Sequence, residues 1–165
     1  MAHFAKLDSN NKVLRVSVVA DRIILDANGE ESEELGIKHL KKIHGEDTIW
    51  KQTSRNGNFR YGFASLNGHY IPEHDIFMVE KPYPSWILSD LNNDVSNPAY
   101  YWRPPIEKPE SLPDASWEGY YEYQWDEVVY QNDTSDPKTE GWVVEPIPGV
   151  EIPEGVGPSE PPAEE

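Results

Sequence analysis

Cysteine is absent from this chain of 165 residues. Disulfides, thiolate metal sites and a thiol nucleophile are therefore excluded. Basic residues are scarce, because 14 lysines and arginines stand against 30 aspartates and glutamates and leave a net charge of −16. A surface this negative repels phosphate backbones and anionic lipids, so we expect no nucleic-acid partner.

Long hydrophobic runs are also missing. The longest, near residues 16–20, is far too short to cross a bilayer. The first eight residues contain no basic segment followed by an apolar core. We therefore expect neither membrane insertion nor a secretory signal.

Hydrophobic residues make up only 37% of the chain, and 15 residues are proline. One packed core over the whole length is therefore not expected. Charge is uneven, with 14 acidic and 11 basic residues over 1–100 but 16 and 3 over 101–165. We predict an α+β head domain at 1–80, an aromatic, proline-punctuated β-hairpin arm at 81–144, and an acidic proline-rich tail at 145–165.

The head begins with a hairpin pattern. Apolar and β-branched residues at 4–7 and 13–19 flank an Asp/Asn-rich turn, which is typical of two antiparallel strands. Alternation places Leu14, Val16 and Val18 on one face, which we expect to be the buried one. A short third strand is expected at 23–25.

One helix is predicted at 31–44. Acidic residues crowd its start and lysines its end, which complements the helix macrodipole, and Gly45 supplies the stop. An apolar stripe near the helical period would lie across the buried face of the hairpin, and it consists of Leu35, Ile37, Leu40 and Ile43. The predicted fold class is thus a small antiparallel sheet of hairpins with one helix.

Further strands are expected at 49–53 and 59–64, and as a hairpin at 69–71 and 76–79. Residues 56–60 allow two interpretations, a small polar binding site or a tight turn in which Gly57 takes a positive φ. The tight turn is the favoured interpretation, because Asn-Gly is a strong turn signal.

Histidines offer two weak arguments for a metal site. His39 and His44 lie five residues apart and do not share a helix face, and no carboxylate completes a site. His69, His74 and Asp75 fall in turn positions, where polar residues are expected anyway. We therefore predict no metal site and no cofactor.

The arm begins where Pro82 and Pro84 flank Tyr83, which favours a stiff, extended exit from the head. Two loosely similar hairpins are expected after it. The first pairs residues 85–88 with 99–102 across an Asn/Asp-rich loop at 90–94, and the second pairs 120–130 with 141–144. A two-stranded hairpin alone is marginal in water.

Five of the six tryptophans lie in this half of the chain. Two interpretations stay open: the rings form a small core between the hairpins, or some face outward as binding anchors. For the second, the candidate protein-interaction residues are Tyr83, Pro84, Trp86, Trp102, Tyr121, Tyr123, Trp125 and Trp142. A hydrolase using Asp126 and Glu127 is not favoured, because adjacent strand residues point to opposite faces.

Several segments together resemble a family of small proteins encoded by tailed phages of marine bacteria, including cyanophages. The resemblance is carried by residues 2–8, 13–20, 50–54, 56–60 and 82–86, with Gly36 in the helix, and covers about residues 1–90. The pattern at 123–127 is similar to the short tryptophan-containing tail of such proteins. This chain departs from the family in its long acidic end and in the residues between Trp86 and Trp102.

The resemblance implies a virion structural protein, made in the cytoplasm of the bacterial host. With the aromatic arm, it leads us to expect a non-enzymatic protein on the particle exterior, decorating or cementing the capsid or attached to the tail. Expected partners are other virion proteins, in a homo-oligomer or multicopy assembly. The alternative is a carbohydrate-binding module that recognises a host glycan from a tail or tail fibre.

Overall fold

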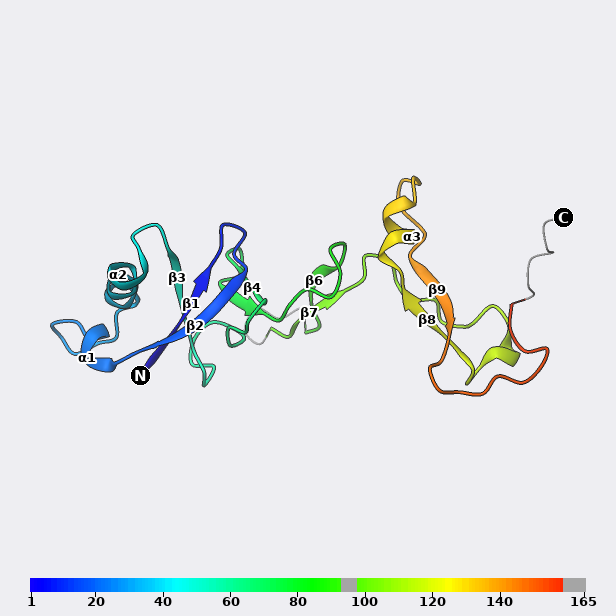
Figure 1. Ribbon diagram of the computed structural model, residues 1–165, viewed down its shortest axis with the longest axis horizontal. Coiled ribbons are helices and arrows are strands. Elements are labelled where there is room, and N and C mark those ends of the chain that lie inside the picture. The colour runs from blue at the N-terminus through cyan, green and yellow to red at the C-terminus, as the bar shows by residue number, and fades with distance from the viewer. Residues whose placement is uncertain (93–97, 159–165) are drawn as a thin grey trace. The chain divides into compact units, whose positions relative to one another are not determined.

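The computed structural model describes residues 1–92 and 98–158 (Figure 1). The chain packs as two compact units. The first combines Met1–Pro82 with Leu88–Trp102, and the second combines Tyr83–Ile87 with the chain from Arg103 onward. Small antiparallel sheets with few helices confirm the predicted α+β class.

A three-stranded antiparallel sheet forms the centre of the first unit, in the order β2-β1-β3. It consists of β1 (Ala2–Leu7), β2 (Val13–Val19) and β3 (Ile49–Thr53). The predicted hairpin is confirmed, since β1 and β2 pair from Ala2 opposite Val19 to Leu7 opposite Val13. The Asp8 carboxylate closes their turn by accepting from the backbone N–H groups of Asn10 and Lys12.

Two helices pack on one face of this sheet (Figure 1). They are the single turn α1 (Asp21–Ile24) and the longer α2 (Glu33–His44). Their core with the strands contains Ala2, Phe4, Val19, Ile24, Leu40 and Trp50. The predicted strand at 23–25 is wrong, because Asp21–Ile24 form a helical turn and Leu25 makes only an isolated bridge to Glu31.

Helix α2 ends at His44 as predicted, but it begins at Glu33, two residues later than predicted. Ser32 caps its start by accepting from the backbone N–H of Leu35, and Gly45 ends it at a φ of 113°. The buried stripe is narrower than predicted, since Gly36 and Leu40 are buried while Ile43 is exposed. Gly36 lets the Phe4 ring approach the helix, because a Cβ there would lie 2.1 Å from Phe4 Cζ.

The opposite face of the sheet is buried too. Ala5, Leu7 and Val13 form a second core there with Ala64 and Phe77. Phe77 lies on β5 (Ile76–Met78), which pairs with β4 (His69–Ile71) and confirms that hairpin.

The predicted single buried face of β2 is therefore wrong. Val13 lies in one core and Val19 in the other. Leu14 and Val18 are 46% and 54% exposed. A bulge beside Leu7, where Val13 and Arg15 pair with consecutive residues, interrupts the simple alternation.

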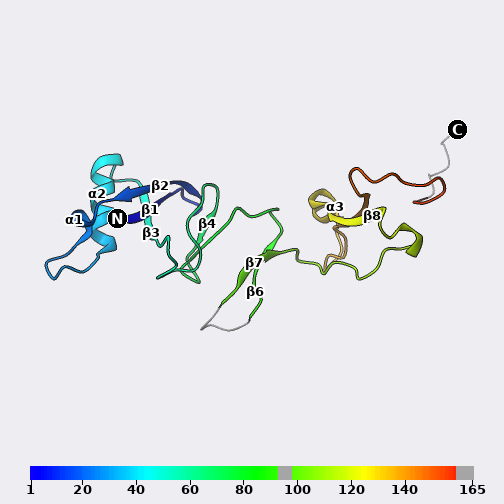
Figure 2. The same cartoon turned by 90° about the horizontal axis from the view of Figure 1, so that it is seen from below.

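Residues 59–64 do not form the predicted strand. The turn before them is confirmed, with Gly57 at a φ of 69°, but Arg60 and Gly62 also have positive φ, which an extended strand does not allow. The predicted hairpin forms from β6 (Ile87–Asp90) and β7 (Tyr100–Arg103), but β6 begins two residues later than predicted and includes Asp90, which was expected in the loop (Figure 2). Residues 93 and 94 of its loop lie outside the described residues.

The second unit contains a 3-10 turn η1 (Ala115–Trp117), then β8 (Tyr121–Trp125), α3 (Glu127–Asn132) and β9 (Trp142–Pro146). Strands β8 and β9 pair over their whole lengths. Helix α3 corrects the prediction that strand continues to residue 130. The interpretation of the sequence as head, arm and tail stays a prediction, and residues 159–165 of that tail lie outside the described residues.

In the part of the chain that the structure describes, no helix combines the length and the apolar character needed to cross a membrane.

Candidate interaction site

The β8–β9 ribbon of the second unit has one apolar face and one polar face. Cross-strand pairing places Tyr121 opposite Pro146, Tyr123 opposite Val144, and Trp125 opposite Trp142. Because side chains alternate along a strand, these six residues share a face. Glu122, Gln124, Val143 and Glu145 share the other face.

Aromatic contacts cover much of the apolar face. Trp125 is only 6% exposed and meets Trp142 edge-on at 5.5 Å and Tyr130 at 5.2 Å between ring centroids. The indole N–H of Trp142 donates to the carbonyl of Ile106 at 3.0 Å. Tyr121 contacts the Trp117 ring at 5.5 Å. This unit thus uses tryptophan and tyrosine rings as its core.

The Glu127 carboxylate ties the segment at 83–87 to this ribbon. It accepts from the backbone N–H and the hydroxyl of Ser85 at 3.1 and 2.6 Å. It also accepts from the Trp125 indole at 3.1 Å and from the Gln131 amide at 2.8 Å. Partial desolvation raises the pKa of Glu127, but these hydrogen bonds outweigh it and lower that pKa below its ordinary value.

An open groove lies on the polar side of the ribbon, with a volume of about 540 Å³. Its polar lining consists of Gln124, Asp126, Glu127 and Glu145, and its apolar lining consists of Tyr83, Trp125, Val128, Val143, Pro146 and Pro148. Val128 is 67% exposed. None of the three carboxylates forms an ion pair with any residue in the described ranges.

Asp126 and Glu127 line the groove, and both also accept hydrogen bonds from neighbouring parts of the second unit. Asp126 caps α3 by accepting from the backbone N–H groups of Val128 and Val129 at 2.8 and 3.0 Å. The pair lies where β8 ends and α3 begins.

The structure brings together some of the predicted interaction residues. Tyr83 and Trp86 are in contact, at 5.5 Å between ring centroids, and Pro84 between them is exposed. Tyr121, Tyr123, Trp125 and Trp142 share the apolar face of the ribbon. Of all eight, Tyr83 and Trp125 line the groove.

Trp102 lies in the first unit instead. Its indole N–H donates to the carbonyl of Val79 at 3.0 Å, and Lys81 Nζ lies 5.5 Å from its ring centre. Tyr100, two residues before it, contacts the rings of Tyr61 and His74. These contacts hold the β6–β7 hairpin in the first unit, while the role of all eight residues in partner binding stays a prediction.

Sequence reasoning missed Val128, Glu145 and Pro148 as groove residues, and the Ser85–Glu127 bonds. An Asp followed by a residue run compatible with a helix is an N-cap signal, so Asp126 was the available clue. No local pattern could indicate the bonds between Ser85 and Glu127, which lie 42 residues apart.

Within residues 1–92 and 98–158, no three histidine or acidic side chains come together in a way that could hold a metal ion. Asp75 instead accepts from Arg60 and Tyr70. Comparison of the chain with models of protein families, with curated proteins and with solved structures found no match.

Proposed function

We propose that this chain is a non-enzymatic structural protein on the exterior of a phage particle, attached to neighbouring virion proteins through the groove of its second unit. The observation that carries the proposal is the pairing of an apolar lining with three carboxylates that form no ion pair within the described residues. The phage context rests on the resemblance over residues 1–90.

The groove fits an extended segment of a partner that carries lysine or arginine. Tyr83, Pro146 and Pro148 offer rigid apolar contacts that lose little side-chain entropy on binding. Asp126, Glu127 and Glu145 attract cations, and the 16 acidic against 3 basic residues after position 100 extend this negative field.

Attachment to the capsid is preferred over attachment to a tail, since the sequence contains no long repetitive fibre shaft. Many copies would then cover the particle. Their negative charge keeps them soluble before assembly.

The test compares full-length variants in their binding to virions of the encoding phage that lack this protein. Tyr83→Ala and Glu145→Lys should each weaken attachment, and higher salt should weaken it further. Glu151→Lys changes charge equally at an exposed position outside the groove and serves as the matched control. Attachment unaffected by both groove variants, or lost equally in the control, would contradict the proposal.

A further inference from the structure

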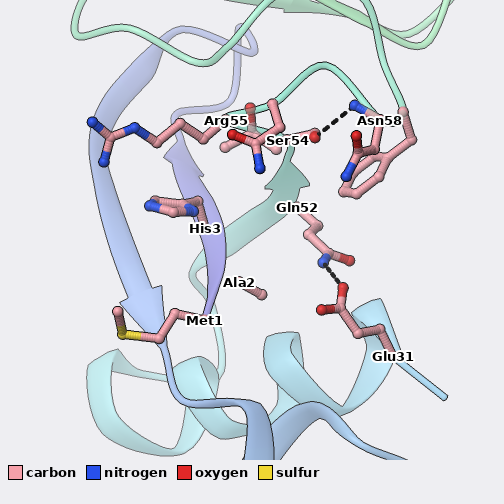
Figure 3. A pocket seen from close by; sticks show the side chains of 11 residues that line it. Met1, Ala2, His3, Glu31, Gln52, Ser54, Arg55 and Asn58 are labelled. Atoms are coloured by element: carbon pink, nitrogen blue, oxygen red, sulfur yellow. Dashed lines mark hydrogen bonds between the residues drawn. The ribbon is translucent and has the colours of Figure 1, made fainter.

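A second hollow lies in the first unit, where β1 begins and β3 ends (Figure 3). It has a volume of about 220 Å³. The end of β3 forms its wall, the loop at 55–59 its rim, and Glu31 and His3 lie at its sides.

The wall consists of three consecutive polar residues that are almost fully buried. Gln52, Thr53 and Ser54 are 6%, 2% and 7% exposed. Buried polar groups normally have partners, and Thr53 Oγ1 has one, the backbone N–H of Ala64 at 3.0 Å.

Gln52 and Ser54 keep bonding capacity that faces the pocket. Gln52 Nε2 donates to Glu31 Oε2 at 3.3 Å, but no described residue donates to its side-chain oxygen. Ser54 Oγ accepts from the backbone N–H of Asn58 at 2.9 Å, but its hydroxyl hydrogen has no acceptor within the described ranges. The Gln52 side-chain oxygen can therefore accept a hydrogen bond from a ligand, and the Ser54 hydroxyl can donate one.

The pocket is held in shape by a network behind it. The Gln52 backbone N–H donates to Glu33 at 2.7 Å, and its carbonyl accepts from Arg60 at 2.8 Å. Arg60 also donates twice to the Glu33 carboxylate and once to Asp75. Both ends of the rim loop are thereby fixed, at Ser54 and at Arg60, before any ligand arrives.

The chemistry of the lining selects a neutral ligand with several hydroxyl groups. An apolar ligand would leave the amide of Gln52 and the hydroxyl of Ser54 without partners. Glu31 opposes an anion such as phosphate, and Arg55 opposes a cation. Each sugar hydroxyl both donates and accepts, which suits amide, hydroxyl, carboxylate and guanidinium groups.

An aromatic side completes the fit. Phe59 lines the pocket and is 39% exposed, so its ring offers an apolar surface for the C–H face of a sugar. The volume lies below the roughly 300–1,000 Å³ of pockets for drug-sized ligands, which limits the occupant to about one ring. We propose that this pocket binds a single neutral sugar ring of a glycan.

A neighbouring hollow offers room for a second ring. It has a volume of about 350 Å³ and shares Glu31, Gln52 and Phe59 with the first. A disaccharide should therefore bind more tightly than its monosaccharide. This site is separate from the groove of the second unit and does not rest on the proposed attachment to a particle.

Saturation-transfer NMR on the full-length chain tests the proposal with a panel of neutral monosaccharides and disaccharides at millimolar concentrations. Inorganic phosphate and a quaternary ammonium salt are the charged probes. Binding of at least one neutral sugar is expected, with little or none of either charged probe. Failure of every neutral sugar, or a preference for phosphate, would overturn the assignment.

Variants then locate the site. Gln52→Met keeps the two backbone bonds of that residue and should raise the Kd about tenfold, since it removes the amide that bonds the ligand. Asn58→Ala, on the exposed rim, should also raise the Kd for the sugar. If Gln52→Met does not fold, the Kd of Asn58→Ala alone tests the location of the site. Asn28→Ala, an equivalent change in another exposed turn, should have no effect.

The two proposals fail separately. Gln52→Met should leave attachment to virions unchanged, whereas the groove variants Tyr83→Ala and Glu145→Lys should leave sugar binding unchanged. Sugar binding that responds to the groove variants and not to Gln52→Met or Asn58→Ala would refute the location proposed for the site.

Discussion

Replacing Arg60 by methionine tests how the loop at 54–60 is held in place. The guanidinium donates four hydrogen bonds: to Glu33 Oε1 and Oε2 at 3.1 and 2.9 Å, to Asp75 at 2.7 Å, and to the Gln52 carbonyl at 2.8 Å. Its side chain is only 10% exposed. Methionine keeps most of the apolar stem and removes every one of these bonds.

The expected loss in the free energy of unfolding is about 3 kcal/mol. The two-point contact with Glu33 contributes about 2 kcal/mol, because that carboxylate is 28% exposed and bonds to charged groups are worth roughly 1.5–3 kcal/mol. The bond to the Gln52 carbonyl adds about 1 kcal/mol. Asp75 adds little, since it is 56% exposed and exposed pairs are worth about 0–1 kcal/mol.

Urea unfolding followed by tryptophan fluorescence measures the loss. Arg15→Met, at an exposed arginine on β2, is the matched control and should change stability by less than about 0.5 kcal/mol. In a double-mutant cycle, the coupling free energy between Arg60→Met and Glu33→Gln should account for most of the stability lost in Arg60→Met. The coupling free energy between Arg60→Met and Asp75→Asn should be small. A loss below about 1 kcal/mol, or equal coupling to both carboxylates, would refute this account.

Three further changes test the packing and the pH response. Gly36→Ala should destabilise the protein by about 1–2 kcal/mol in thermal unfolding, because crowding Phe4 outweighs the helix propensity of roughly 1 kcal/mol that alanine gains; a stabilised variant would contradict the packing. Gly141→Ala should cost about 2–4 kcal/mol in urea unfolding, since φ is 152° and its Cβ would lie 2.5 Å from Trp125; an unchanged midpoint would refute the contact. Burial raises the pKa of Asp75, but hydrogen bonds outweigh burial and hold that pKa below its ordinary 3.8. The stabilising contribution of the Asp75 carboxylate is therefore present above pH 3.8 and is lost below it. The stability difference between the native chain and Asp75→Asn should therefore shrink on acidification below 3.8, and a difference that grows would have the wrong sign.

Local turn and helix signals account for the parts of the fold that the sequence predicted well. Asp8 and Gly57 mark turns, and Gly45 marks a helix end, because each meets a need of the backbone within a few residues. The hairpins followed from these signals and from strand-forming residues between them.

Tertiary contacts account for the errors. The second face of the first sheet is buried because Ala64 and Phe77, more than 50 residues along the chain from Val13, return to cover it. Helix α3 contains Val128, Val129 and Tyr130, which favour strands, but the Asp126 cap and the Tyr130–Trp125 contact outweigh that preference.

The candidate groove was predicted only in part. Aromatic composition directed attention to Tyr83 and Trp125, which do line it. Composition could not predict its acidic lining, because Glu145 and Glu127 come together only through the pairing of β8 with β9 and the start of α3. The polar pocket of the first unit depends equally on the meeting of Glu31 with Gln52.

The edges of the sheets indicate which unit can accept a strand from a partner. On the outer edge of β3, the Gln52 N–H donates to the Glu33 side chain and the Gln52 carbonyl accepts from the Arg60 side chain. At the start of β2, the Val13 N–H donates to the Gly68 carbonyl and the Val13 carbonyl accepts from the Asn67 N–H. Blocking of this kind prevents edge-to-edge pairing. In the second unit, no third strand among the described residues pairs with β8 or β9. A partner strand would add main-chain hydrogen bonds only along an outer edge of this ribbon and not from the groove on its polar face, so strand addition would be a contact separate from the proposed groove contact.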